Sequence, residues 1–308
     1  MKITRELEAL EPPPEGSVVS IGVFDGVHLG HQAILGANVA HALDLGCVPT
    51  VVTFQRHPKE LLVGHAPKTL TTLEHRLELF ARSGVQHAVA LAFDEELRGL
   101  SARDFVRRCA VEGLGVRRFV LGFDSKFGHD RAGSAEMLRA EGFEVEVVPK
   151  VVLDERGVSS TVIREAVELG ELERAAAMLG RRVSVFGRVV RGDNLGREIG
   201  FPTANLDLHH ELHPPAGVYA CRTRLFSSEG KRETHDAVAN IGFRPTVEVH
   251  LLDFEGDLYG ERLELAFFAH LRGEERFPDL ASLSAQIQLD VQAARKALAG
   301  LPEEPPAA

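Results

Sequence analysis

The chain has 308 residues, enough for two domains with separate cores, and its 44% hydrophobic and 26% charged residues are typical of a globular protein. Its 35 basic and 45 acidic residues give a formal net charge of -10, which argues against nucleic acid as a partner. Anionic ligands would therefore need local cationic pockets or Mg²⁺. No apolar run in the sequence is long enough to cross a membrane, so we expect no membrane partner.

The first motif, VVSIGVFDGVHLGHQ at residues 18–32, predicts a short strand, a sharp turn and a helix that begins near His28. His28 and His31 would share one face of the first helical turn, where free N–H groups and the helix dipole attract anions. The motif favours a nucleotide triphosphate, although an ordinary strand, turn and helix with solvated histidines is the alternative. The candidate phosphate-binding residues are Gly22, Phe24, Asp25, Gly26, His28, Gly30 and His31.

The following segments alternate between strand-like and helix-like patterns, which predicts an α/β fold with a Rossmann-like parallel sheet. The predicted strands cover residues 49–54, 87–93 and 118–123, and residues 144–153 are predicted to form a further strand or a strand pair. The predicted helices cover residues 32–45, 72–83, 101–109 and 134–141, and two more end near Gly170 and Gly180. Ligands on such sheets bind beyond the carboxyl ends of the strands, where TFQRHP (53–58) and LGFDSKFG (121–128) also fall.

A second anion-binding helix start is predicted at SSTVIR, residues 159–164. Hydroxyls at a helix N-terminus can bind phosphate, and Arg164 can neutralise its charge. An ordinary N-cap sequence is the alternative. The candidate residues are Ser159, Ser160, Thr161 and Arg164.

Near residue 181 the alternation stops and short strand-like segments follow one another, which predicts a small antiparallel β-barrel. These segments cover residues 183–190, 217–225, 236–241, 247–254 and 262–271. A helical pattern over residues 280–298 predicts a terminal helix packed on the barrel. We therefore expect one domain at residues 1–180 and another at residues 181–308.

The segment GRVVRGDNLGREIGFPTANL, residues 187–206, predicts a flexible loop that closes over phosphates, because Gly192, Gly196 and Gly200 recur every four residues. Thr203 and Asn205 follow on an extended segment, and their oxygens could hold Mg²⁺. The alternative is a turn in which both side chains bond the backbone, and without further information it is the favoured one.

Eight motifs occur in this order: GVFDGVHLGHQ, SSTVIR, GFPTANL, AGVYACR, AVANIGFRPT, VEVHLLDF, DLYGERL and LRGEERF. Through them the chain resembles the bacterial bifunctional riboflavin kinase and FAD synthetase family over nearly its whole length. The resemblance implies a Rossmann-like nucleotidyltransferase domain followed by a riboflavin kinase-like barrel. It further implies that Thr203 and Asn205 contact Mg²⁺ and ATP and that Glu248 is a catalytic base. The residues it places near the flavin are Phe54, His57, Asp124 and Arg272.

Three departures from the family pattern stand in the sequence. Arg56 replaces a proline, Ser125 replaces an aromatic residue, and the loop before Glu248 is shortened. Because of Arg56 and Ser125, a riboflavin kinase with a weakened adenylyltransferase half is an alternative. A flavin-binding carrier or redox flavoprotein without ATP turnover is another.

A kinase that acts on an alcohol needs a carboxylate to accept the hydroxyl proton, which Glu248 can supply. In VEVHLLDF, Glu248 and His250 share one strand face, opposite Val247 and Val249. A solvent-facing glutamate on an edge strand is the alternative.

The family's two reactions use riboflavin, FMN and ATP as substrates with Mg²⁺, and FAD is the final product. The FMN phosphate is already an anion, so His28, His31 and Arg164 would act by positioning and charge stabilisation rather than as bases. The sequence does not establish an oligomeric state.

The three cysteines, Cys47, Cys109 and Cys221, are far apart and show no CxxC spacing. They predict free thiols, not a disulfide framework or a zinc site, and favour a cytoplasmic location.

Overall fold

The computed structural model describes residues 1–58, 61, 64, 67–191, 200–209, 211–227, 231–242 and 247–301. The chain divides into two compact units, the first made of residues 1–69 and 76–160 and the second of residues 70–75 and 161–305. This division follows compactness alone, so the domain boundary at residue 181 stays a prediction.

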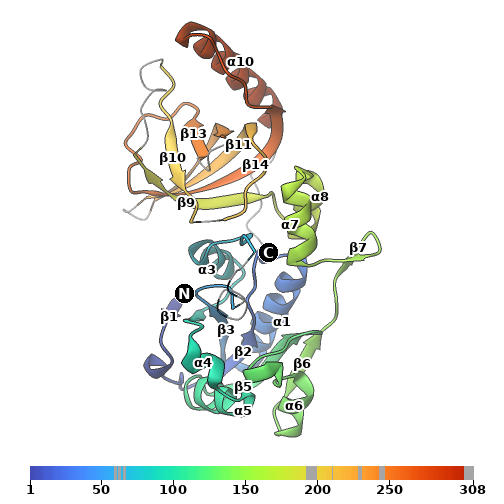
Figure 1. Cartoon of the computed structure of the whole chain (residues 1–308). Coiled ribbons are helices and arrows are strands. Elements are labelled where there is room, and N and C mark those ends of the chain that lie inside the picture. The colour runs from blue at the N-terminus through green and yellow to red at the C-terminus, as the bar shows by residue number, and fades with distance from the viewer. Residues whose placement is uncertain are drawn as a thin grey trace. The chain divides into compact units, whose positions relative to one another are not determined.

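The first unit is built on a six-stranded parallel sheet with the order β1-β4-β3-β2-β5-β6 (Figure 1). Its strands are β1 (Lys2–Thr4), β2 (Ser17–Ile21), β3 (Val48–Phe54), β4 (His87–Leu91), β5 (Val116–Gly122) and β6 (Val145–Val148). The order of the strands reverses at β2, between β3 and β5, and such a switch point is where open α/β sheets bind ligands. The predicted Rossmann-like sheet is confirmed.

Helix α1 (Leu29–Leu45) covers one face of this sheet. Its Ala42 packs with Val18 and Val120, and its buried Asn38 donates hydrogen bonds to the carbonyl oxygens of Val18 and Thr50 at 3.1 and 3.2 Å. The helix ends at Gly46 in the left-handed conformation, φ 62°, as predicted. These contacts hold α1 against β2 and β3.

The opposite face of the sheet packs on the helical segments that follow β4, because Val19 and Phe119 alternate to this side and contact Phe105, Cys109 and Leu138. These segments include a π-helix, which replaces the later part of the predicted helix 101–109. The helices after α1 are α3 (Leu73–Arg82), α4 (Glu95–Gly99), α5 (Ala102–Phe105), the π-helix Val106–Glu112 and α6 (Ala135–Ala140). The first three residues of α3 are counted with the second unit. Short 3-10 helices cover Leu7–Ala9 and His129–Arg131. A small hairpin of β7 (Val152–Leu153) and β8 (Arg156–Gly157) follows β6.

The second unit contains α7 (Ser160–Glu168) from Thr161 onward, α8 (Leu172–Leu179) and a closed antiparallel barrel. The barrel order is β10-β13-β12-β11-β14-β9. Its strands are β9 (Ser184–Val190), β10 (Ala204–Asp207), β11 (Gly217–Phe226), β12 (Arg232–Ile241), β13 (Val247–Leu251) and β14 (Arg262–Arg272). The predicted barrel is confirmed, although the strand expected to reach residue 254 ends at Leu251.

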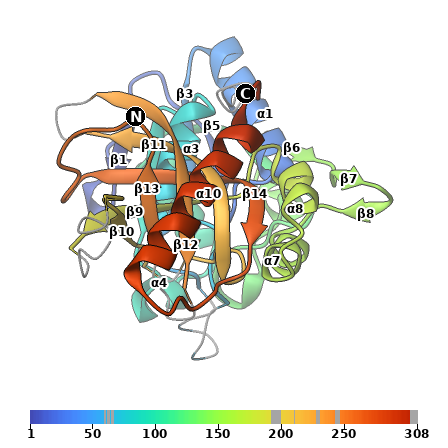
Figure 2. The ribbon, with the colours of Figure 1, turned by 90° about the horizontal axis from the view of Figure 1, so that it is seen from above.

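Helix α10 (Leu280–Leu298) lies across β11, β12 and β14 (Figure 2). Ala294 and Leu298 pack on Val218 and Val238 of the barrel's outer surface. Residues that alternate with these along the strands point the other way and fill the barrel interior, among them Ala239, Ile241, Leu265 and Phe267. The terminal helix is confirmed with the predicted bounds.

A buried charged cluster holds the segment 70–75 within the second unit. The two ring nitrogens of His75 lie 2.8 Å from Glu211 Oε1 and 3.3 Å from Glu264 Oε1, and Glu211 Oε2 accepts a hydrogen bond from the Phe186 N–H at 2.7 Å. Burial alone would lower the pKa of His75, but the charges and hydrogen bonds of Glu211 and Glu264 outweigh it and raise that pKa above its usual 6.5. The raised pKa favours the protonated imidazole, whose two N–H groups lie within hydrogen-bond distance of both carboxylates, and burial raises the pKa of Glu211 as well.

In the part of the chain that the structure describes, no helix combines the length and apolar character needed to cross a membrane.

Candidate functional site

The loop between β2 and α1 adopts an unusual backbone conformation. Phe24, Gly26 and Val27 have φ angles of 54°, 83° and 40°. Left-handed φ angles at non-glycine residues cost on the order of 1–3 kcal/mol each and persist only where the surroundings impose them. The loop follows the switch point of the sheet, where the sequence predicted a nucleotide.

Buried supports impose this conformation. Arg76 of α3 donates hydrogen bonds from Nη1 to the Val23 carbonyl at 2.5 Å and from Nη2 to the Phe54 carbonyl at 3.0 Å. Ser160 Oγ, at the start of α7, donates to the Asp25 carbonyl at 2.9 Å. The sequence reasoning missed Arg76, because no local pattern marks an arginine whose partners lie 53 and 22 residues away along the chain.

The two histidines lie together at the start of α1. His28 is the N-cap, its Nδ1 accepts a hydrogen bond from the His31 N–H at 3.4 Å, and the two rings stack with centroids 3.7 Å apart. Because His28 Nδ1 accepts, its proton is on Nε2, which can donate to an anion. A Cβ added to Gly30 would lie 3.2 Å from His28 Cε1, so the glycine permits this close approach. The predicted shared face of the two imidazoles is confirmed.

Other predicted residues follow the strands on either side of β2. Phe54 ends β3 and contacts Phe93 edge-to-face with centroids 5.5 Å apart, and His57 lies just beyond. Asp124 is exposed two residues after β5. Phe54 lies at a carboxyl end and His57 and Asp124 lie beyond one, as expected, and their role in flavin binding stays a prediction.

The predicted anion-binding residues 159–164 lie at the start of α7. Ser160 is the first residue of this helix, and Arg164 is one turn further along. Ser160 belongs to the first unit, whereas Thr161 and Arg164 are counted with the second. Their joint role with His28 and His31 therefore stays a prediction.

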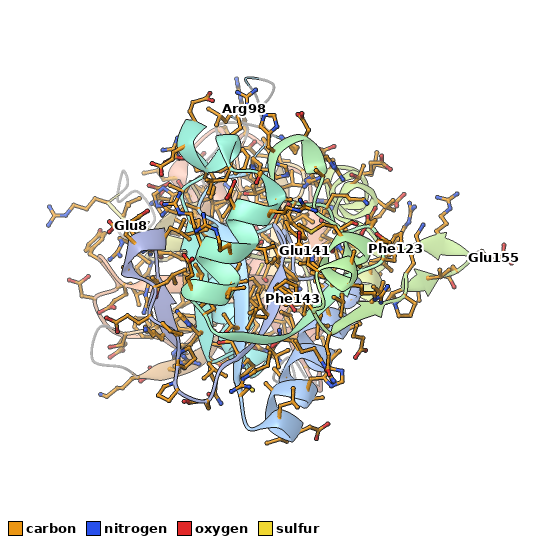
Figure 3. The ribbon with its side chains drawn as sticks, turned by 90° about the horizontal axis from the view of Figure 1, so that it is seen from below. Glu8, Arg98, Phe123, Glu141, Phe143 and Glu155 are labelled. Carbon is orange, nitrogen blue, oxygen red and sulfur yellow. The ribbon has the colours of Figure 1, made fainter. Side chains whose placement is uncertain are left out.

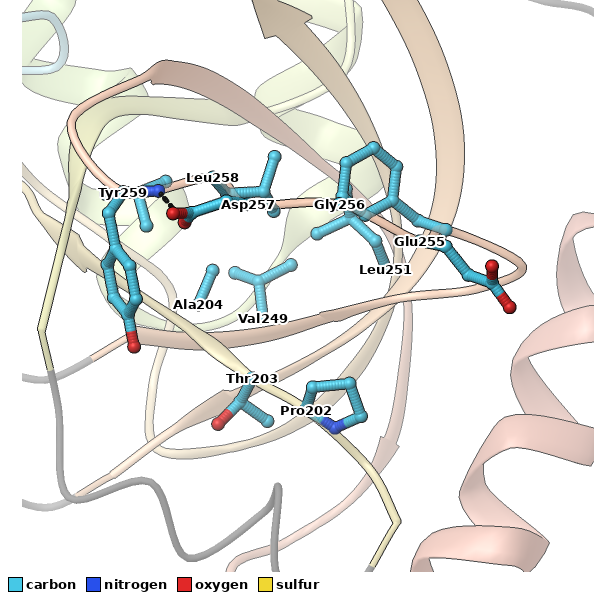
Figure 4. A pocket seen from close by; sticks show the side chains of 12 residues that line it. Pro202, Thr203, Ala204, Val249, Leu251, Glu255, Gly256, Asp257, Leu258 and Tyr259 are labelled. Carbon is cyan, nitrogen blue, oxygen red and sulfur yellow. Dashed lines mark hydrogen bonds between the residues drawn. The ribbon is translucent and has the colours of Figure 1, made fainter.

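The barrel carries a pocket of about 560 Å³ beside Thr203. Figure 4 shows Thr203, Ala204 and Val249 on one side of it and the loop that carries Asp257 and Tyr259 on the other. Asp257 accepts a hydrogen bond from the Tyr259 N–H at 2.9 Å, which shapes the loop. No functional residue was predicted in this loop, although its DLYGERL motif is one of those that carry the family resemblance.

Asn205 and Glu248 are direct register partners on β10 and β13. Directly opposite residues share a face, so the two side chains point away from Ala204 and Val249, which line the pocket. Because β13 pairs with β10 on one side and β12 on the other, Glu248 is not on an edge strand. Glu248 is partly buried and also lies opposite Asn240.

His250, on the same face as Glu248, holds the segment before Thr203. Its Nδ1 donates a hydrogen bond to the Pro202 carbonyl at 2.8 Å, and its ring contacts Phe201 edge-to-face with centroids 5.5 Å apart. Thr203, the residue after Pro202, lines the pocket and lies two residues before Asn205 in the chain.

Arg272 ends β14 and is bound to Asp290 of α10, with Nε–Oδ1 and Nη2–Oδ2 distances of 3.0 and 2.8 Å. The hydrogen bonds to Asp290, which is buried, raise the pKa of Arg272 further above its usual value. Asp290 was missed by sequence reasoning, since a lone acidic residue in an amphipathic helix carries no signal. Whether Arg272 lies near a flavin stays a prediction.

Gly192 and Gly196 of the predicted phosphate loop lie outside the described residues. The last glycine of that loop, Gly200, is described and has a φ of 86°.

Comparisons with known proteins bear on both halves. A family model described as FAD synthetase matches residues 10–162, and one described as riboflavin kinase matches residues 179–298. The bifunctional riboflavin kinase/FMN adenylyltransferase of Pseudomonas fluorescens is 41% identical over 307 residues, which cover 96% of this chain and 97% of that protein. This chain belongs to the bifunctional riboflavin kinase/FMN adenylyltransferase family. The family inferred from the motifs is thereby confirmed.

Other members of the family agree. The Escherichia coli K12 enzyme of the same name is 38% identical, with 96% of this chain and 97% of that protein covered. A crystal structure named as a macrolide-efflux protein from Streptococcus pneumoniae is 30% identical with a TM-score of 0.78, covering 95% of this chain and 98% of that one. The likeness to this solved structure supports the fold, and the efflux activity in its name is said of that protein and not of this chain.

Proposed function

We propose that this chain makes FAD from riboflavin in two ATP-dependent steps. The riboflavin 5′-hydroxyl attacks the γ-phosphate of one ATP to give FMN and ADP, and an FMN phosphate oxygen attacks the α-phosphate of a second ATP to give FAD and pyrophosphate. The observation that carries the proposal is the presence of two different candidate nucleotide sites in two separate units, one at His28 and His31 and one at Thr203. A flavin carrier without enzymatic activity would need neither.

In the kinase half, Glu248 is proposed as the base that accepts the proton of the riboflavin hydroxyl as charge develops on the oxygen. The pocket between Thr203 and Tyr259 is proposed to hold the adenosine of ATP, because its lining combines apolar side chains with the hydroxyl groups of Thr203 and Tyr259. The phosphates would then extend past Thr203 toward the face that carries Glu248. His250 supports this by fixing Pro202.

The side chains of Thr203 and Asn205 fit Mg²⁺, because both supply hard oxygen ligands next to the proposed phosphates. Among the described residues, no three His, Cys, Asp or Glu side chains gather into a metal-binding set. A cation held by few protein ligands together with nucleotide phosphates matches the usual preference of Mg²⁺. When bound, the ion would neutralise charge on the transferred phosphoryl group.

In the adenylyltransferase half, no base is needed because the attacking FMN phosphate is ionised at neutral pH. We propose that His28 and His31 donate hydrogen bonds to the triphosphate at the N-terminus of α1 and stabilise charge as the α-phosphate reacts. Arg164 adds positive charge, and Ser159, Ser160 and Thr161 supply hydroxyl donors. Phe54, His57 and Asp124 are proposed to contact the flavin nucleotide.

A chromatographic assay tests the proposal. Purified protein is incubated with riboflavin, ATP and Mg²⁺, and the flavins are separated. Appearance of FMN followed by FAD is expected. If FMN accumulates and no FAD forms, even when FMN is supplied as the substrate, the alternative of a weakened adenylyltransferase half is favoured. Arg56 and Ser125 are the reasons for that alternative. Bound flavin without ATP consumption would contradict both.

We also propose that the adenylyltransferase domain covers residues 1–180 and the kinase domain residues 181–308, which the extents of the two family models support. A cytoplasmic location is proposed from the three free cysteines, Cys47, Cys109 and Cys221.

A further inference from the structure

The segment after β5 leaves an aromatic ring exposed at the ligand-binding edge of the parallel sheet. Phe123 directly follows Gly122, the last residue of β5, and is 54% exposed. In the described part of the chain, the only other aromatic side chain among the exposed large hydrophobic residues is Tyr259, which lines the barrel pocket. Phe123 is thus the most exposed of the phenylalanines that the structure describes.

A cation faces this ring. Lys150 Nζ lies 5.9 Å from the centre of the Phe123 ring, within the range of a cation–π interaction. Lys150 lies two residues after β6, so it comes from the carboxyl end of the neighbouring strand. A Cβ added to Gly157 would lie 1.8 Å from Lys150 Cε, so the glycine of β8 leaves room for the lysine. Figure 3 shows Phe123 on the side of the hairpin whose turn carries Glu155.

Ser125, which stands where the family pattern has an aromatic residue, closes the turn after β5 instead. Its Oγ accepts a hydrogen bond from the Gly122 N–H at 3.0 Å, and its own N–H donates to the Gly122 carbonyl at 3.1 Å. Both polar groups of Ser125 are therefore used to close the turn after β5. The exposed aromatic side chain of this turn is Phe123.

The position of this ring relative to the histidine pair follows from the sheet order. β5 pairs with β2 on one side and with β6 on the other. The carboxyl ends of three adjacent strands thus carry, in order, the His28–His31 loop, Phe123 and Lys150. Adjacent strands lie about 4.8 Å apart, so one ligand of nucleotide size can touch all three.

We propose that Phe123 stacks on the isoalloxazine ring of FMN during adenylylation, and that Lys150 orients the Phe123 ring and attracts the FMN phosphate. This inference rests on the proposed function. A flat apolar ring beside an ammonium group matches a ligand that combines a planar aromatic system with an anion. Phe123 would thereby supply the aromatic contact that Ser125, two residues later in the chain, lacks the ring to make.

The test measures the KM for FMN in FAD synthesis. Phe123→Ala is expected to raise this KM roughly 3- to 10-fold, the range for loss of one aromatic pair, with a smaller effect on kcat. Phe123→Leu removes the ring but keeps apolar bulk and should behave like Phe123→Ala, whereas Phe123→Tyr should retain the wild-type KM. Lys150→Gln should raise the KM less than Phe123→Ala does.

Val152→Ala is the matched control, because Val152 is an apolar residue of β7 with a similar exposure of 55%. Thermal unfolding, measured on each preparation, reports whether the first unit is correctly folded, because FMN formation is assigned to the second unit. If Phe123→Ala and Val152→Ala have the same KM for FMN while wild-type protein makes FAD, the inference is wrong and the proposed function stands. If wild-type protein makes no FAD from FMN and ATP, both are wrong.

Discussion

The two candidate nucleotide sites are built by different means. The loop at Phe24 and Val27 has an irregular backbone that buried side chains hold in place, whereas Asn205 and Glu248 are placed by the register of two regular strands. A change in backbone freedom should therefore disturb the first site most. A change of one side chain should disturb the second, because its backbone stays paired on both sides.

The chemistry differs in the same way. The kinase must deprotonate a hydroxyl and so needs a carboxylate such as Glu248 at a defined place. The adenylyltransferase starts from an anion and needs donors at a helix N-terminus, such as His28 and His31. The two reactions should therefore be separable by single substitutions.

The largest expected effect is on the kinase. Glu248→Gln should lower the rate of FMN formation roughly 10²- to 10⁴-fold, because the base is lost while the shape is kept. FAD formation from supplied FMN should be unchanged. Glu233→Gln on β12 is the control for loss of a glutamate from the barrel, and equal losses in both variants would contradict the role of Glu248.

The next effect concerns stability of the second unit. His75→Gln should destabilise the protein by about 3–5 kcal/mol, because it leaves Glu211 and Glu264 buried without their cation. The pKa of His75 is raised, so its contribution is fully present below pH 6.5 and is lost as the pH rises through the raised value. Denaturant unfolding at several pH values should show the gap between wild type and variant shrinking toward alkaline pH. A gap that widens would contradict this assignment.

For the first site, His31→Asn should lower the rate of FAD formation from FMN and ATP roughly 10²- to 10³-fold, as expected for loss of a donor to the reacting phosphates. FMN formation from riboflavin should stay at the wild-type rate. His41→Asn on the same helix is the matched control. A parallel loss of both activities in His31→Asn would refute separate sites.

The smallest effect tests the backbone. Gly26→Ala places a side chain at φ 83°, which costs about 1–2 kcal/mol. FAD formation should fall severalfold because the loop shifts, and FMN formation should be unaffected. Gly36→Ala on α1, where an added Cβ meets nothing within 4 Å, should change neither activity. Equal behaviour of the two variants would show that the loop conformation is unimportant.

Local patterns predicted much of the fold. The terminal helix 280–298 and the end of α1 at Gly46 follow from periodicity and a glycine stop signal. The four-residue strand β10 was expected only as an extended segment, and the three-residue β1 was not predicted, because neither is long enough to show alternation.

The supports of the sites could not be predicted from the sequence. His75 meets Glu211 and Glu264 across 136 and 189 residues of sequence, and Arg76 meets Val23 and Phe54 across 53 and 22 residues. Such contacts depend on the packing of whole elements, so a single histidine or arginine in a helical pattern gives no sign of them.

The central claim is that each half performs its own reaction at its own nucleotide site. Mixing two variants that each lack one of the two activities tests this claim most directly. Glu248→Gln alone should not convert riboflavin to FAD, and His31→Asn alone should stop at FMN. Incubated together with riboflavin, ATP and Mg²⁺, the two proteins should restore FAD synthesis, because FMN released by one is adenylylated by the other. A mixture that makes no FAD, although each variant retains its remaining activity, would contradict two independently working sites.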